Sequence, residues 1–80
     1  MESKIVIIGA GEVGFNLAKS LSRENHEITV IDNDPQKCIR IKNNLDSHVI
    51  EGDGASQRVL QLIDMKKVDY LLALTRIDEV

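Results

Sequence analysis

Four short apolar runs, separated by segments with helical spacing, set the pattern of this chain. The runs are residues 4–8, 27–31, 48–51 and 69–74, and the first two are rich in β-branched side chains. Short apolar runs of this kind are typical of strands that are buried on both faces of a sheet. The segments between them place apolar residues on one side of a helix. The pattern therefore predicts the order β-α-β-α-β-α-β.

The first helix is predicted over residues 12–24. Its apolar side consists of Val13, Leu17, Ala18 and Leu21. Glu12 lies in the first turn and Arg23 near the end, which suits the helix dipole. Asn25 then fits a left-handed stop.

The second helix is predicted from Pro35 to about Asn44, with Asp34 as its N-cap. Its apolar side consists of Cys38, Ile41 and Leu45. A short third helix over residues 57–63 has Ser56 as a possible cap. Residues 75–80 look like the beginning of a further helix.

Right-handed crossovers between these elements give an α/β fold with a parallel sheet and helices on both faces, which makes three layers. The expected strand order is 3-2-1-4, as in a Rossmann-like doubly wound sheet. At 80 residues the chain is at most one domain. A complete doubly wound domain carries two further strands. We therefore expect residues 1–80 to be the N-terminal part of a dinucleotide-binding domain, with the fourth strand as an exposed edge.

The first strand leads directly into Gly-Ala-Gly-Glu-Val-Gly, a Gly-x-Gly-x-x-Gly turn that opens a helix. Gly9 permits the sharp turn, Gly11 lets backbone approach a pyrophosphate, and Gly14 lets the helix pack closely on the strand. The helix N-terminus offers unpaired N–H groups to the anion. The residues expected to hold the pyrophosphate are Gly9, Ala10, Gly11, Glu12, Val13 and Gly14. A plain glycine turn in a nucleotide-free α/β domain is the structural alternative.

Asp32 ends the second strand about 20 residues after the glycine motif, where a carboxylate binds the adenosine ribose hydroxyls. Its charge would repel a 2′-phosphate, and Asn33 and Asp34 beside it supply no arginine. This favours NAD(H) over NADP(H), and we include Asn33 in the same site. A solvent-facing strand end is the alternative interpretation of Asp32.

Two other loops end at the same edge of the sheet. In the loop 52–55, Asp53 and Gly54 could lie near the adenine, or they could form a plain turn before the next helix. After the fourth strand, Thr75 could contact the phosphate or nicotinamide side, or cap a helix. Arg76 could reach a phosphate, although a solvated charge explains it equally simply.

Composition excludes several functions. A net charge of −3 and 2% aromatic residues argue against nucleic-acid binding. No apolar run has the roughly 20 residues that span a bilayer, and no signal peptide is evident. A single cysteine suits a reducing cytoplasm. His26 and His48 lie at the strand ends away from the expected crevice, without metal-ligand spacing, and Cys38 fits the core. We therefore predict no metal site, no catalytic residue and no enzymatic activity.

Beyond the glycine motif, the chain resembles the N-terminal domain of the Trk-type potassium-uptake regulatory proteins, also called the regulator-of-potassium-conductance (RCK, or KTN) family. The resemblance spans essentially the whole chain and is carried by residues 9–14, 16–21, 28–32, 51–54 and 72–75. Family members often have Gly-Asp-Ala-Thr after the third strand. Here Gly54 and Ala55 follow Asp53, and the hydroxyl of Ser56 comes one position later.

The resemblance implies a cytosolic regulatory subunit, attached through a partner to a membrane potassium transporter or channel. It implies binding of NAD or NADH, or alternatively of ATP or ADP, in a homo-oligomer whose paired domains move with ligand state. By matching motif, Asp53 would lie at the adenine end and Thr75 at the distal phosphate or nicotinamide end. Two other functions stay open: the coenzyme-binding fragment of an NAD-dependent dehydrogenase, and an assembly module without a ligand.

Overall fold

Four parallel strands form one sheet in the order β3-β2-β1-β4. The computed structural model describes residues 3–54 and 56–74 of the 80-residue chain. The strands are β1 (Lys4–Ile8), β2 (Glu27–Asp32), β3 (His48–Glu51) and β4 (Tyr70–Ala73). The predicted strand order and the parallel α/β fold are therefore confirmed.

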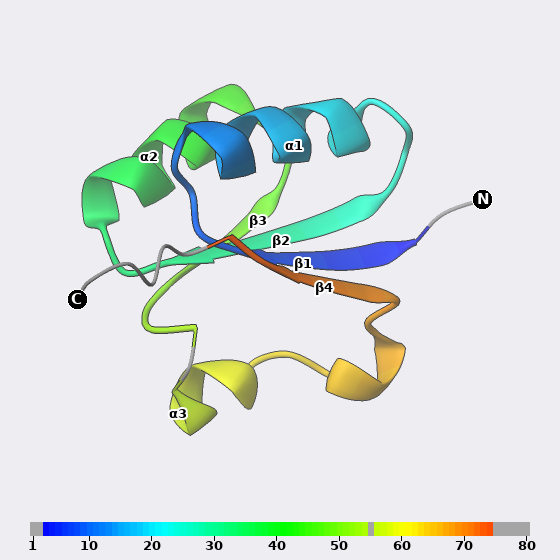
Figure 1. Cartoon of the computed structure of the whole chain (residues 1–80), viewed down its shortest axis with the longest axis vertical. Coiled ribbons are helices and arrows are strands. Elements are labelled where there is room, and N and C mark those ends of the chain that lie inside the picture. The colour runs from blue at the N-terminus through cyan, green and yellow to red at the C-terminus, as the bar shows by residue number, and fades with distance from the viewer. Residues whose placement is uncertain (1–2, 55, 75–80) are drawn as a thin grey trace.

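Helices cover both faces of the sheet, so the predicted three layers are also confirmed (Figure 1). One face carries α1 (Glu12–Ser22) and α2 (Pro35–Asn44), and the other carries α3 (Gln57–Leu60) and the 3₁₀ turn η1 (Met65–Lys67). The helical layer formed by α3 and η1 is much thinner than the α1–α2 layer, because it contains only these two short elements and their connections.

Two helices are shorter than the sequence predicts. The first ends at Ser22 instead of residue 24, because Glu24 N–H donates to the Leu21 carbonyl in a tighter turn. Asn25 then has a φ of 66°, which confirms the left-handed stop. The third was expected over residues 57–63 and ends at Leu60.

The segment after α3 also tightens. The N–H groups of Leu62 and Ile63 donate to carbonyls three residues earlier instead of four, which closes the segment as turns. Ser56 occupies the N-cap position but makes no side-chain capping bond. The turn η1 was not predicted at all. Its start is fixed by Asp64, whose side chain accepts from the N–H of Lys66.

β4 is one residue shorter at each end than predicted, although its neighbours still pair with β1. Asp69 N–H donates to the Lys4 carbonyl and Leu74 N–H to the Ile8 carbonyl, both at 2.8 Å. Tyr70 and Leu71 in this strand remain exposed.

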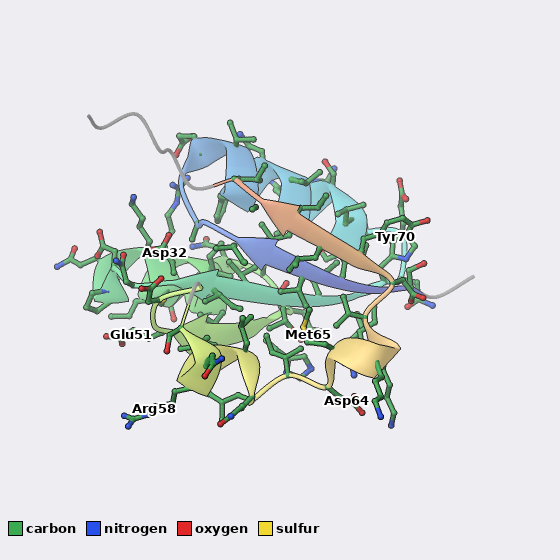
Figure 2. All side chains as sticks on the ribbon, turned by 60° about the horizontal axis from the view of Figure 1, so that its bottom comes forward. Asp32, Glu51, Arg58, Asp64, Met65 and Tyr70 are labelled. Atoms are coloured by element: carbon green, nitrogen blue, oxygen red, sulfur yellow. The ribbon has the colours of Figure 1, made fainter. Side chains whose placement is uncertain are left out.

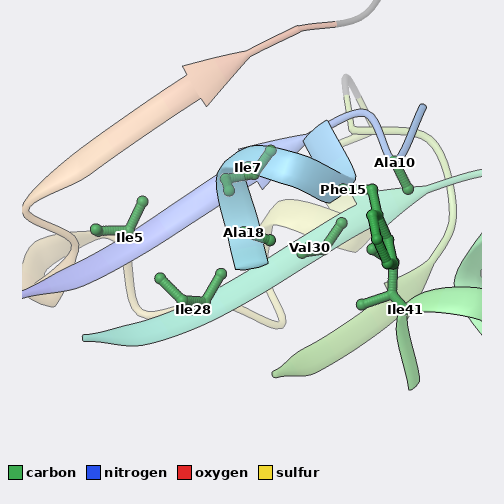
Figure 3. Close-up of a cluster of buried hydrophobic side chains, with 8 residues drawn as sticks. All are labelled: Ile5, Ile7, Ala10, Phe15, Ala18, Ile28, Val30 and Ile41. Carbon is green, nitrogen blue, oxygen red and sulfur yellow. The ribbon is translucent and has the colours of Figure 1, made fainter. Parts of the chain in front are cut away.

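The main core lies between the sheet and the α1–α2 layer (Figure 3). Its buried members are Ile5, Ile7, Ala10, Phe15, Ala18, Ile28, Val30 and Ile41. The apolar side predicted for α1 was partly wrong, since Val13 is 68% exposed and Phe15 is buried in its place. Close packing of Gly14 on the first strand turns α1 so that residues 14, 15 and 18 face inward.

α2 follows its prediction closely. Asp34 is its N-cap and accepts a hydrogen bond from Gln36 N–H at 2.9 Å, and Pro35 begins the helix. Cys38 and Ile41 are buried, and Leu45 packs against the core from the C-cap position.

Ile41→Ala should reduce the free energy of unfolding by about 2–5 kcal/mol, because it leaves a cavity in the main core. The matched control is Ile39→Ala on the same helix, where the side chain is 56% exposed and the expected change is within about 0.5 kcal/mol. Urea unfolding measures both. Similar losses for the two variants would contradict the placement of the core.

Candidate functional site

The loops that follow β1, β2 and β3 meet at the carboxyl ends of the strands. Gly9 N–H donates to the Ile31 carbonyl at 2.8 Å, and Gly52 N–H donates to the Asp32 carbonyl at 2.9 Å. Asp32 and Glu51 lie in register at this edge of the sheet, opposite the edge that carries Tyr70 (Figure 2). The topology therefore brings together the loops that the sequence analysis singled out.

The Asp32 carboxylate joins two of these loops directly. Its Oδ2 accepts from Ala10 N–H at 2.7 Å, and its Oδ1 accepts from Asp34 N–H at 2.8 Å. A carboxylate has about four acceptor positions, so both oxygens retain capacity for hydroxyl donors. Asp32 thus fixes the glycine loop while it still presents an acceptor surface to the crevice.

Each glycine of the motif has a different environment. Gly9 has a φ of 117°, which side-chain-bearing residues rarely adopt. A Cβ on Gly14 would collide with the Gly9 carbonyl oxygen, so α1 packs directly on the end of the first strand. A Cβ on Gly11 would meet nothing within 4 Å. The space beside Gly11 is therefore open to a ligand.

The N-terminus of α1 points into this space. Gly11 is its N-cap and supplies no side-chain acceptor, so the first-turn N–H groups have no intrahelical partner. Glu12 in this turn is held by Arg40 of α2, with 2.6 Å between Oε1 and Nη1. The same guanidinium lies 4.0 Å from the centre of the Phe15 ring.

A pocket of about 390 Å³ lies at these loops. It is lined by Gly9, Gly11, Glu12, Val13, Gly14, Asp32, Asn33, Lys37 and Leu74. Lys37 and Leu74 were missed by the sequence analysis. Lys37 could have been found from its place in the first turn of α2, which begins right after Asp32. Val13 was predicted both on the apolar side of the helix and in the glycine loop, and it lines the pocket.

Seven predicted site residues line this pocket, namely Gly9, Gly11, Glu12, Val13, Gly14, Asp32 and Asn33, and the others that the structure describes do not. Ala10 is buried and its N–H is bound to Asp32. Asp53 is exposed, and Gly54 packs so closely on Ile8 that a Cβ there would collide with it. Neither is among the described residues that line the pocket. Thr75 and Arg76 lie outside the described residues.

The other titratable candidates have structural surroundings. His26 accepts from Ser3 N–H through Nδ1 at 3.1 Å, away from the crevice. Cys38 is buried, and its thiol donates to the Asp32 carbonyl at 3.3 Å. Burial, followed by the nearby charges of Asp32 and Glu51, raises the pKa of the Cys38 thiol.

Residues 3–54 and 56–74 contain neither a metal-binding cluster nor a membrane-spanning helix. No group of three or more His, Cys, Asp and Glu side chains there is arranged to hold a metal ion. No helix in those ranges is both long and apolar enough to cross a bilayer.

Residues 5–80 match the family model of the TrkA-N domain. The chain belongs to the TrkA-N domain family. This agrees with the resemblance noted from the motifs and with the glycine loop, Asp32 and strand order described above.

Curated relatives align with this TrkA-N chain over 77 residues, or 96% of its length. The Trk system potassium uptake protein TrkA of Halomonas elongata is 40% identical. TrkA homologues of Methanosarcina mazei and Archaeoglobus fulgidus are 46% and 42% identical. The match covers only 16–17% of the length of these three proteins.

Gly14→Ala should lower the free energy of unfolding by about 2–3 kcal/mol, because the collision with the Gly9 carbonyl outweighs the better helix propensity of alanine. Gly11→Ala is the matched control, since its methyl group enters open space and should cost about 1 kcal/mol or less. Thermal unfolding compares the two. A Gly14→Ala protein as stable as the Gly11→Ala protein would contradict the close packing.

The raised thiol pKa makes a pH-dependent contribution to stability. The folded chain keeps the Cys38 proton when the unfolded chain loses it, so this contribution is complete below the ordinary pKa of 9.0 and is lost as pH rises above it. Urea unfolding across this range should therefore show a steeper fall for the wild type than for Cys38→Ala. Parallel curves would contradict it.

Proposed function

We propose that this domain binds NAD or NADH in the pocket beside Gly11 and, within a longer cytoplasmic protein, regulates a Trk-type potassium transporter. One observation carries the proposal: an open space lies between a bare helix N-terminus and a carboxylate at the end of β2. These are the positions that take the pyrophosphate and the ribose in dinucleotide-binding sheets. The potassium link is supported by the names of the relatives.

In this proposal the loop from Gly9 to Gly14 and the N-terminus of α1 hold the pyrophosphate. Asp32 accepts from the ribose hydroxyls, and Asn33 lies beside it. From the resemblance we infer that Asp53 and Gly54 serve the adenine end, and that Thr75 and Arg76 serve the distal end. ATP and ADP share the ribose and two phosphates, so they compete for the same pocket.

Discrimination against NADP(H) depends on Asp32. Its carboxylate is held in place by two N–H donors, so it cannot swing away from an incoming 2′-phosphate. Lys37 lines the same pocket and offsets part of this repulsion. The Asp32 carboxylate is fixed at the proposed ribose position, whereas the Lys37 ammonium is carried on a flexible side chain. The repulsion by Asp32 therefore dominates, and NAD(H) is preferred.

The proposed role is regulation and not catalysis. A regulatory domain must bind its ligand with different affinity in two states, because only differential affinity shifts an equilibrium. In a homo-oligomer, a ligand-dependent change in the relative orientation of paired domains would be transmitted to the membrane partner and would change its transport activity. This requires a binding site and a moving interface, and no reacting groups.

Calorimetric titration of NAD⁺, NADH, NADPH, ATP and ADP tests the proposal. We expect NAD(H) or adenine nucleotides to bind, and NADPH to bind at least about tenfold more weakly than NADH, which corresponds to about 1.4 kcal/mol. Gly11→Val should abolish binding, because its side chain fills the open space that the pyrophosphate needs.

Gly11→Ala adds only one methyl group to the same space, so it should weaken binding less than Gly11→Val does. Asp32→Ala should weaken the binding of every adenine nucleotide, since it removes the ribose acceptor and also releases Ala10 N–H. Normal NADH binding by Gly11→Val would place the pyrophosphate elsewhere. Turnover of NAD⁺ with a substrate would instead favour a dehydrogenase.

A further inference from the structure

The pocket contains an acidic side chain where a phosphate would be expected to bind. Glu12 lies in the first turn of α1 and lines the pocket together with Gly11 and Gly14. Its carboxylate complements the helix dipole in the absence of ligand. A phosphate at the same helix end would be repelled by it, since like charges at close range oppose binding.

Arg40 offsets this charge from a different helix. It lies 28 residues along the chain from Glu12, on α2, and its Nη1 is 2.6 Å from Glu12 Oε1. Lys37, one turn earlier on α2, lines the pocket and has no ion-pair partner among the described residues. The acidic end of α1 therefore faces a basic side of α2.

The position of Arg40 is fixed by a second contact. Its guanidinium carbon lies 4.0 Å from the centroid of the Phe15 ring, and that ring is only 9% exposed. An arginine that stacks on a buried ring loses less freedom when it also forms an ion pair. Phe15 thus holds the guanidinium beside Glu12 before any ligand arrives.

We propose that Arg40 is a positioning residue that sets the affinity of the pocket for phosphate-bearing ligands by neutralising Glu12. It acts through Glu12 and does not itself hold the ligand. This inference rests on the proposed nucleotide-binding function and adds a residue that determines ligand class. Without Arg40, the bare carboxylate of Glu12 would oppose each phosphate at the helix N-terminus.

A purely structural role of the pair predicts different behaviour. The side chains of Arg40 and Glu12 are 45% and 74% exposed, and exposed ion pairs contribute only about 0–1 kcal/mol to stability. If the pair only joined α1 to α2, Glu12→Gln alone would weaken the binding of all ligands as Arg40→Met does, and adding Glu12→Gln to Arg40→Met would restore no affinity.

A double-mutant cycle on the full chain separates the two roles. Arg40→Met keeps an unbranched side chain over Phe15 and removes the charge, and Glu12→Gln removes the opposing charge. NADH affinity is measured by calorimetry for the wild type, both single variants and the double variant. We expect Arg40→Met to lower the affinity for NADH about three- to tenfold at low ionic strength. The double variant should bind NADH with an affinity within about twofold of the wild type.

Two controls make the cycle specific. Adenosine has the ribose but no phosphate, so its affinity, followed by NMR titration, should not change in Arg40→Met. Lys42→Met removes a positive charge from the same helix at a residue outside this pocket, and should leave NADH affinity within about twofold. High salt should reduce the effect of Arg40→Met.

Each outcome decides the inference. Weakening of NADH by Arg40→Met that Glu12→Gln rescues, with adenosine unchanged, supports it. A double variant that binds NADH as weakly as Arg40→Met, or equal weakening of adenosine and NADH binding, overturns it and leaves Arg40 as a packing residue, with the proposed function intact. A wild-type chain that binds no nucleotide overturns the proposed function and this inference together.

Discussion

The arrangement of the loops at the carboxyl ends of the strands depends on one residue, Asp32. Asp32 accepts from Ala10 N–H and Asp34 N–H, while its own carbonyl accepts from Gly52 N–H and the Cys38 thiol. Four contacts therefore tie three segments, the glycine loop, the start of α2 and the loop after β3, to one residue at the end of β2. Hydrogen bonds to an ionised acceptor are stronger than neutral ones, so this hub is well suited to hold short loops in place. The residue best placed to contact a ribose also keeps the glycine loop in position.

The sequence predicted the sheet well because its signals are local and strong. Apolar runs set the strands, and the loops between them required right-handed crossovers, which leave few possible strand orders. The ends of elements were predicted less well. α1 and α3 end early where bonds to carbonyls three residues back replace helical bonds, a competition decided by tertiary packing. Val13 was misplaced for a similar reason, since the rotation of α1 is set by Gly14 against Gly9 and not by apolar spacing.

The candidate site was predicted unevenly. Glycines and Asp32 follow a motif with fixed spacing, so their positions could be derived. Leu74 could not be placed, because its proximity to the pocket depends on how β4 lies against β1, whereas the place of Lys37 in the first turn of α2 was a usable signal. The bridge from Arg40 to Glu12 and Phe15 joins side chains on two helices and has no local signature. Contacts between elements are the information that spacing along a chain does not carry.

The two faces of the sheet are unequally supported. The cluster beneath the sheet contains three buried side chains, Val6, Ile31 and Val59, and its helix α3 has four residues. Segments with little buried surface open locally at lower free energy than a main core. Gly52 and Gly54 lead into this thin layer, whereas Gly9 packs directly against Gly14 of α1. The proposed phosphate end of the crevice is therefore built on the main core, and the proposed adenine end on the thinner layer, so binding at the adenine end would carry the larger cost in conformational entropy.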